Sequence, residues 1–233
     1  MNPLLIRRRG MMTAAGGVED RTLTFTAEQG NSTVKIVTRG SNPNSISVEY
    51  NIGGGWLPYT VGNTITLANI GDFVKFRGNN ASMNRDNSSG NKFNITGLVA
   101  ASGDVTSLLN GVGGDVALSS YCFSDLFDSC YGLSAAPYFP SKNLGYMCYI
   151  RTFRYCTRIL EYHFYTLNTS TPFLLGSGCL ALYIEATTPP TISSNTLGGL
   201  PATCIIYVPA GSVEAYQAKQ YWSARAAYIQ ATP

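Results

Sequence analysis

The sequence predicts a mainly β protein of the α+β class, with an N-terminal antiparallel β-sandwich followed by a short solenoid of repeats. Two observations carry this prediction. Between residues 21 and 101, apolar side chains recur at every second position, in short runs that turn residues separate. From residue 118 the pattern changes, and the segment 121–133 returns 26 positions later as 147–159. A fixed period of this length is typical of stacked units that bury one shared core.

Six or seven short strands are expected in the N-terminal part. Turn-forming residues separate them at 29–31, 41–44, 53–55 and 70–72, and such regular spacing without a helical stretch predicts an antiparallel sandwich. The loop 78–91 carries no core residue except Met83, so it is expected to be an exposed surface loop, with ligand binding as the alternative. The alternating strand residues are Leu23 and Phe25, Val34 and Ile36, Ile46, Val48 and Tyr50, Ile65 and Leu67, Val74 and Phe76 or Phe73 and Lys75, and Phe93 and Ile95.

Each repeat is expected to run from a helix through a turn to a strand. Apolar residues between 118 and 130 recur at helical spacing, which predicts a helix of about three turns. Its other face, with Ser120, Ser124, Asp125 and Asp128, is expected to meet water. Gly132 is then expected to cap the helix, with a strand near Leu133 or Ile159. The third repeat has the clearest strand, at 180–185, whereas 161–175 is interpreted as an insertion and a contact surface.

A Cys-x-x-apolar anchor marks the repeats at residues 130, 156, 179 and 204, with steps of 26, 23 and 25. The repeat predicts a small apolar side chain at these positions, and a free cysteine behaves as one. The six cysteines are therefore interpreted as a buried ladder of reduced thiols. Cysteines eight apart on one helix lie ~12 Å apart, too far for a disulfide. The expected repeat core comprises Cys122, Phe123, Leu126, Phe127, Cys130, Leu133, Cys148, Phe153, Cys156, Ile159, Cys179, Leu182 and Cys204.

Two segments resemble a known family. The run FSDLFDSCYGL at 123–133 is similar to the BspA-like leucine-rich repeats of surface and phage proteins of gut Bacteroidales. The segment 188–222, TPPTISSNTLGGLPATCIIYVPAGSVEAYQAKQYW, resembles the closing part of that family, where a final strand precedes a capping helix. The resemblance spans residues 22–230 and implies a leucine-rich-repeat solenoid that serves adhesion and binding. It does not fix an activity, because fold does not determine function.

The first residues carry apolar side chains before basic ones, unlike a secretory signal, and no apolar run is long enough to span a membrane. We therefore expect synthesis and assembly inside a cell. The segment resembles those heading tail-fibre and head-fibre proteins of gut phages, which implies an anchor in the virion; a disordered tail is the alternative. The expected anchor residues are Leu4, Leu5, Ile6, Arg7, Arg8, Arg9, Met11 and Met12.

Three regions follow from these patterns: an anchoring segment at 1–20, a β-sandwich at 21–101, and a leucine-rich-repeat domain with a C-terminal capping helix at 102–233. Val105, Leu108 and Leu109 are expected to cap the first repeat.

Composition and motifs narrow the function. Charged residues make up 12% of the chain and the net charge is +3, which favours no nucleic-acid partner. One histidine and no C-x-x-C pair give no metal site, and we expect no cofactor. No catalytic serine can be named for His163 and Glu161. Asp125 and Asp128 are expected on a solvated helix face, which offers no cleft, so no enzyme is predicted. Aromatic candidates for sugar contacts, or equally for packing, are Trp56, Tyr59, Tyr138, Tyr162 and Tyr165.

The favoured hypothesis is a structural phage protein at the virion surface, a head-fibre or capsid decoration protein made in the host cytoplasm. It would dock on capsid or tail proteins, form a homo-oligomer, dimer or trimer, and display its repeats to host-surface glycans. The alternative is a bacterial cell-surface adhesin of the same repeat family, which would need an export signal near its start. A sugar-degrading enzyme is the third reading, and it lacks a catalytic constellation.

Overall fold

The computed structural model describes residues 20–167, 177–197 and 199–233. The protein is mainly β, with three sheets and a few short helices. The expected anchor residues between Leu4 and Met12 lie outside the described residues. In the described ranges, no helix is both long and apolar enough to cross a membrane.

Two sheets form the N-terminal part. A six-stranded sheet has the order β4-β3-β6-β1-β8-β9, and a three-stranded sheet has the order β5-β2-β7. Their pairs are antiparallel except β8 with β9. Alternation identified most of these strands, while the short β4 and the strand β8 were not expected. The bounds are β1 Leu23–Ala27, β2 Ser32–Arg39, β3 Val48–Asn51, β4 Leu57–Pro58, β5 Ile65–Leu67, β6 Phe73–Gly78, β7 Gly90–Thr96 and β8 Val99–Ser102.

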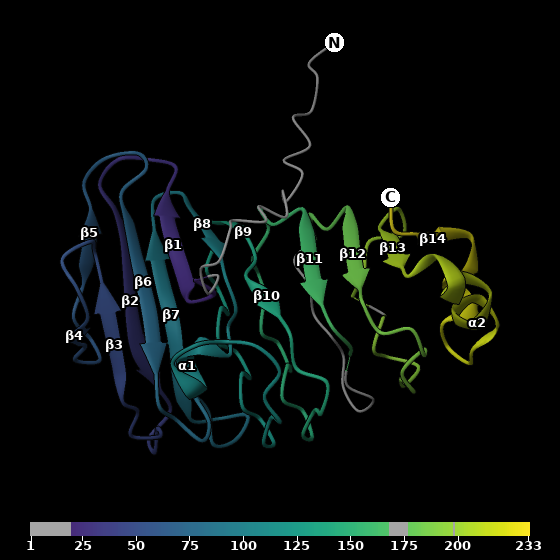
Figure 1. The fold of residues 1–233 in the computed structure, drawn as a ribbon, viewed down its shortest axis with the longest axis horizontal. Helices are drawn as coiled ribbons and strands as arrows, with labels where there is room; N and C mark the ends of the chain where they lie inside the picture. The colour runs from purple at the N-terminus through teal and green to yellow at the C-terminus, as the bar shows by residue number, and fades with distance from the viewer. Residues whose placement is uncertain (1–19, 168–176, 198) are drawn as a thin grey trace, which may run out of the picture.

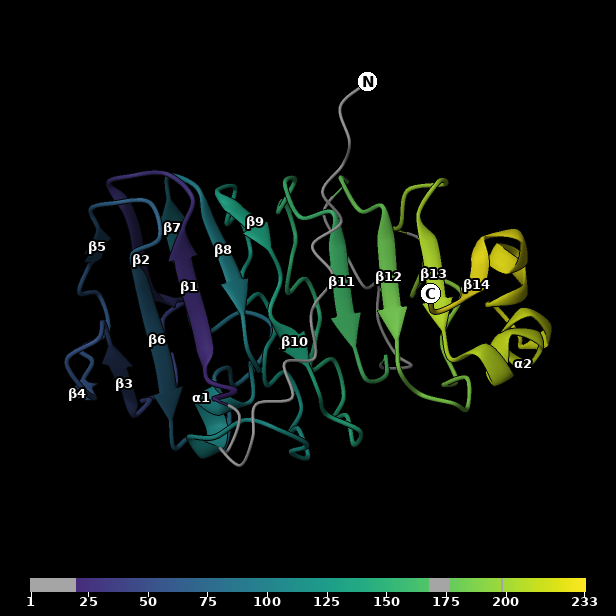
Figure 2. The same ribbon diagram turned by 45° about the horizontal axis from the view of Figure 1, so that its top comes forward.

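A five-stranded parallel sheet, β10-β11-β12-β13-β14, forms the C-terminal part. Figures 1 and 2 show its strands side by side along the long axis, continuing the row that the N-terminal strands begin. The expected strands at 180–185 and 205–208 are present, followed by a short helix. The bounds are α1 Ser107–Asn110, β9 Leu133–Ala135, β10 Tyr138–Phe139, β11 Glu161–Phe164, β12 Ala181–Ile184, β13 Ile205–Val208, η1 Ala210–Ser212, α2 Val213–Ala218, η2 Ser223–Tyr228 and β14 Ile229–Ala231.

One core runs through both parts. Phe25 of β1 contacts Phe93 of β7 with ring centroids 4.8 Å apart, across the gap between the two N-terminal sheets. Phe93 stacks on Phe127 at 5.4 Å, and Phe127 stacks on Phe153 of the next repeat at 5.2 Å. All residues expected in the repeat core are buried, and all six cysteines are free thiols. The N-terminal sheets thus continue directly into the repeats.

The expected helix at 118–130 is wrong. The segment is a ribbon of overlapping turns, in which Tyr121, Asp125 and Ser129 have positive φ angles of 59°, 54° and 62°. The equivalent residues of the next repeat, Met147, Arg151 and Tyr155, have the same left-handed conformation. The apolar pattern therefore reflects a period of four residues in a turn ribbon, which is close enough to 3.6 to imitate a helix.

Backbone hydrogen bonds explain the ribbon. The N–H groups of Cys122, Ser124 and Leu126 each donate to the carbonyl three residues earlier, as in a β-turn. The intervening N–H groups, such as those of Phe123 and Asp125, donate instead to the carbonyls of Cys148 and Ile150 in the next repeat at 2.9 Å. In a helix, the N–H groups beyond the first turn all donate to carbonyls of the same helix. Alternate donation, within the segment and then to the next repeat, therefore identifies the turn ribbon.

Two further expectations need correction. Gly132 is not a helix cap: a Cβ there would lie 2.1 Å from the carbonyl oxygen of Gly97, so the close approach of two backbones requires glycine. The segment 161–164 is not an insertion, because it forms the repeat strand β11. The rest of that expected insertion falls partly on residues 168–175, which lie outside the described part of the chain.

The loop 78–91 is also less exposed than expected. Met83, Asn84, Ser89 and Asn91 are buried. Asparagine side chains form hydrogen bonds with backbone groups there, and this satisfies the polar atoms of a buried loop: the Asn91 amide donates to the carbonyl of Met83 at 3.0 Å.

Substituting Phe127→Ala tests the continuous core. Phe127 stacks on both the N-terminal sheets and the second repeat, so its loss is expected to lower the free energy of unfolding by about 3–5 kcal/mol. The matched control is Phe73→Ala, at a half-buried position of β6, where a loss of about 1 kcal/mol or less is expected. Urea unfolding followed by circular dichroism measures both; equal losses would contradict the shared core.

Candidate functional site

A row of aromatic side chains crosses the outer face of the parallel sheet. The strand register places Tyr138 beside His163, His163 beside Tyr183, and Tyr183 beside Tyr207, and the row ends at Gln230 of β14. Buried and accessible positions alternate along β11 and β13, and Tyr183 is the one accessible position of β12. All four aromatic residues are partly exposed. We call Tyr138, His163, Tyr183 and Tyr207 the aromatic ladder.

The ladder rings stack on one another. The ring centroids of His163 and Tyr183 are 4.3 Å apart with an angle of 5° between the planes, and those of Tyr183 and Tyr207 are 4.8 Å apart at 23°. Neighbouring strands lie about 4.8 Å apart, so the parallel register itself imposes this ring spacing. Because both faces of the Tyr183 ring are covered, the ladder presents ring edges and hydroxyl groups to a ligand.

Two ladder hydroxyls are available for binding. Within the described residues, the phenol groups of Tyr183 and Tyr207 make no hydrogen bond, whereas the Tyr138 hydroxyl donates to the carboxylate of Glu185 at 2.5 Å. Burial raises the pKa of Tyr183, and the charge of Glu161 raises it further. Tyr183 therefore stays a neutral phenol that can both donate and accept.

A small pocket lies at the β10 end of the ladder. It has a volume of about 130 Å³ and is lined by Ala101, Ser102, Ala136, Tyr138 and His163. Pockets that enclose a small ligand measure roughly 300–1,000 Å³. This pocket is thus a recess in the sheet face that is too small to enclose a substrate.

The aromatic residues singled out from the sequence fall into different environments. Tyr138 belongs to the ladder, and Tyr165 lies half-buried beside Lys142, whose amine is 5.0 Å from the ring centroid. Tyr162 and Tyr59 are buried, and the Tyr59 hydroxyl donates to the carbonyl of Asn63. Trp56 lies under the guanidinium of Arg77, 4.2 Å from its ring, far along the chain from the ladder. Tyr183 and Tyr207 were missed as surface residues: Tyr183 lies four residues after Cys179, and Tyr207, three residues after Cys204, was interpreted as the apolar residue of the anchor.

His163 and Glu161 are the candidate catalytic pair of the sequence. Both lie on the accessible face of β11, as their spacing predicted, but the imidazole ring stacks on Tyr183. Among the described residues, no group of three His, Cys, Asp or Glu side chains could hold a metal ion.

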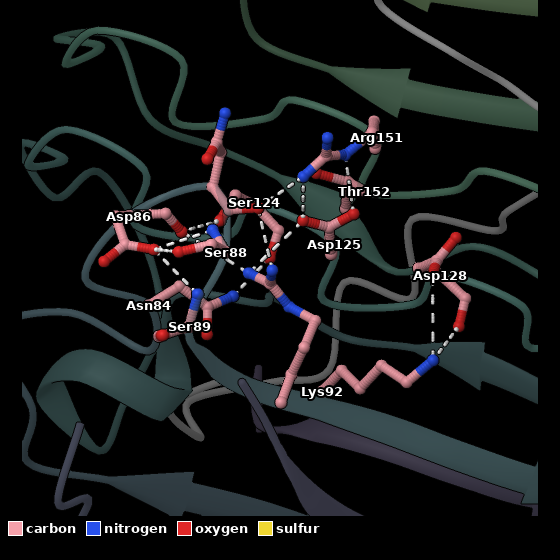
Figure 3. Close-up of polar contacts among 12 residues, drawn as sticks. Asn84, Asp86, Ser88, Ser89, Lys92, Ser124, Asp125, Asp128, Arg151 and Thr152 are labelled. Carbon is pink, nitrogen blue, oxygen red and sulfur yellow. Dashed lines mark hydrogen bonds and ion pairs between the residues drawn. The ribbon is translucent and has the colours of Figure 1, made fainter. Parts of the chain in front are cut away.

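The two aspartates of the first repeat lie at a charged junction (Figure 3). Asp125 accepts two hydrogen bonds of 2.8 Å from Arg151, the residue 26 positions later, and also pairs with Arg39 of β2 at 3.3 Å. Asp125 is fully buried. Its contacts with Arg39 and Arg151 join the first repeat to the N-terminal sheets and to the second repeat.

Asp128 repeats the arrangement one turn later. It accepts hydrogen bonds of 2.7 and 3.0 Å from Arg154, again 26 positions along, and pairs with Lys92 of β7 at 3.6 Å. The adjoining loop contributes as well: Asn84 donates its backbone N–H to Cys122 and its side-chain amide to the carbonyl of Ser124. The junction is therefore held by charged and neutral hydrogen bonds together.

The expectation that Asp125 and Asp128 meet water is wrong, because both are buried and each is bound by an arginine. The helical reading placed them on an outer face, whereas the turn ribbon directs them against the neighbouring repeat. A glycosidase acid and nucleophile need different environments, whereas Asp125 and Asp128 share the same one, since each is held by an arginine. The spacing of 26 between each acid and its arginine matches the repeat period and could have revealed both pairs.

The substitution Asp125→Ala is expected to lower the free energy of unfolding by about 3–5 kcal/mol, because it leaves two arginine side chains, only 18% and 24% exposed, without their buried partner. Glu49→Ala is the control. It breaks a single ion pair with Arg77 whose side chains are 41% and 34% exposed, and a loss of about 0–1 kcal/mol is expected. Thermal and urea unfolding would refute the role of the junction if both variants lost the same amount.

Comparison with known proteins leaves the family resemblance as an expectation. No protein-family model, curated protein or solved structure matches this chain.

Proposed function

We propose that this chain is a non-enzymatic binding protein that displays the aromatic ladder to glycans, as a structural component of a phage virion. The observation that carries the proposal is the ladder itself: four aromatic side chains, aligned by strand register, on an accessible sheet face. An ordered accessible strip of this kind marks an interaction site.

The proposed architecture is a β-sandwich that leads into a short leucine-rich-repeat solenoid. Support for the sandwich comes from the aromatic contacts between β1 and β7 across two facing sheets. Support for the solenoid comes from one parallel strand per repeat and from the lateral hydrogen bonds between successive turn ribbons. Each unit of a solenoid contacts its neighbours, so the display face is rigid and its groups are evenly spaced.

A glycan fits the chemistry of this face. The phenol groups of Tyr183 and Tyr207 can donate to and accept from sugar hydroxyls, and the exposed carboxylates of Glu161 and Glu185 can accept further hydrogen bonds. Stacking of a sugar ring on Tyr183 is blocked, because its faces are covered by His163 and Tyr207. Recognition therefore proceeds through edges and hydroxyls. The two carboxylates favour a neutral glycan over an anionic one.

The virion context rests on sequence patterns. A low charged fraction, abundant tyrosine and the resemblance to repeats of phage proteins favour a head-fibre or decoration protein at the virion surface. Residues 1–20 would dock on capsid or tail proteins, and the chain would assemble as a dimer or trimer. A bacterial cell-surface adhesin could use the same ladder, so virion attachment has to be tested separately.

The ladder is tested by Tyr183→Ala and Tyr207→Ala in the full chain. Each change removes a hydroxyl and a ring edge, and a loss of roughly tenfold in affinity for neutral oligosaccharides is expected, equivalent to about 1.4 kcal/mol. The control is Tyr155→Ala, a tyrosine 56% exposed in the turn ribbon of the second repeat, where no loss is expected. An array of neutral and sialylated oligosaccharides provides the measurement. Preference for the sialylated set, or equal loss in the control, would contradict the proposal.

Anchoring is tested with Arg7→Glu, Arg8→Glu and Arg9→Glu combined in the full chain. Reversing these charges is expected to abolish co-sedimentation with phage particles that lack the protein, while glycan binding is retained. The control reverses Lys35, Arg85 and Lys219, which lie outside the anchor segment. If the unaltered chain binds glycans and never sediments with particles, the adhesin interpretation replaces the virion one.

A further inference from the structure

The last two repeats bring two buried thiols together. The Sγ atoms of Cys179 and Cys204 are 2.9 Å apart. This separation is shorter than the optimal distance of about 3.5–4.0 Å between two non-bonded carbon atoms. The two side chains therefore form a close S–H···S contact.

Their backbone placement suits a covalent bond. Cys179 and Cys204 lie directly before Leu180 and Ile205, and the N–H of Ile205 donates to the carbonyl of Leu180 at 2.9 Å. The register pairs Ala181 with Ile205, so Cys179 lies one residue before the position level with Cys204. Strands about 4.8 Å apart with a rise of about 3.3 Å per residue place Cα atoms offset in this way roughly 6 Å apart, within the range of about 4.4–6.8 Å that a disulfide needs. The bond thus fits the backbone of β12 and β13.

The other stacked cysteines differ. The thiol of Cys156 donates to the carbonyl of Phe127 at 3.0 Å, and that of Cys130 donates to the carbonyl of Phe93 at 3.3 Å. Burial raises the pKa of Cys156 to about 12. The thiols of Cys179 and Cys204 also have carbonyl acceptors, Ala181 and Ile205, but at the longer distances of 3.6 and 3.7 Å. Cys130 and Cys156, with closer backbone acceptors and protonated thiols, are therefore matched controls.

We propose that Cys179 and Cys204 are a disulfide-forming pair, a redox modification site that joins the last two repeats when the protein meets a peroxide. Cys204 is the attacking thiol. The hydrogen bond from Cys179 lowers the pKa of Cys204, and the nearby Arg225 lowers it further, against the opposing effect of burial.

The chemistry proceeds in two balanced steps. The Cys204 thiolate attacks one oxygen of hydrogen peroxide, the O–O bond breaks, and a sulfenic acid forms with release of hydroxide, which takes up a proton as water. The sulfur of Cys179 then attacks the sulfur of Cys204, so that the S–S bond forms and the S–O bond breaks; the leaving hydroxide takes the Cys179 proton as a second water. Two thiols lose two electrons in total to one peroxide.

The full chain allows a direct test. Trypsin leaves both cysteines on one peptide, residues 159–219, and places the other four cysteines on different peptides. After peroxide treatment, denaturation and alkylation, mass spectrometry is expected to find this peptide unalkylated and lighter by two hydrogen atoms. Reductant should restore two alkylation sites. A peptide that is alkylated at both positions, or oxidised without a bridge, would overturn the proposal.

Variants separate this pair from general thiol oxidation. Cys130→Ala with Cys156→Ala is expected to keep the bridge, whereas Cys179→Ser is expected to abolish it. The bridge closes a loop of 25 residues, so the oxidised wild type should melt about 6–12 °C higher than the reduced form. An equal rise in Cys179→Ser would overturn the assignment. If a variant does not fold, the peptide map of the unaltered chain still decides the question.

Discussion

The lateral hydrogen bonds between one turn ribbon and the next are the interaction on which the rest of the structure depends. Alternate N–H groups of the first ribbon donate to the second, as Tyr121 does to Tyr146 and Ser129 to Arg154. On its other side the same ribbon accepts from the N-terminal part, through the N–H groups of Asn84 and Phe93. Buried backbone groups need partners, so the N-terminal sheets complete the first repeat and cannot be a merely tethered neighbour.

This constraint also decides which side chains meet. Residues 26 positions apart lie on top of each other, so an unchanged repeat would stack like charge on like charge. The two repeats avoid this by placing an arginine over each aspartate, as Arg151 lies over Asp125. Aromatic residues can repeat without conflict, and Phe127 over Phe153 does so. Cysteines are accommodated as well, because a small thiol can donate to the backbone of the neighbouring repeat, as Cys156 does.

Much of the fold could be predicted from the sequence, because period-two alternation directly reflects strands with one buried face. β1, β2, β6 and β7 were found in this way, and the repeat pattern predicted β9, β12 and β13, whereas β11 was interpreted as part of an insertion. The turn ribbon could not be found, because four residues per turn and 3.6 give the same apolar pattern over three turns; only backbone φ at positions such as Tyr121 separates them. That error also hid the charged junction. Tyr183 and Tyr207 were missed because their importance lies in register between strands, which a single repeat does not show.

The ends of such a stack determine whether it can present a surface at all. A parallel sheet with a bare final strand would offer unpaired backbone groups to another chain. At the β14 end, Gln217 of α2 donates to the carbonyl of Ile229 at 3.2 Å, and α2 lies beside this end of the sheet (Figure 1). At the opposite end, Tyr138 of β10 donates its N–H to the carbonyl of Gly103, and its carbonyl accepts from Val105. Both ends of the described sheet thus lie against other parts of the chain. The glycan binding that we propose for the ladder uses side chains of the sheet face and does not compete with backbone contacts at these two ends.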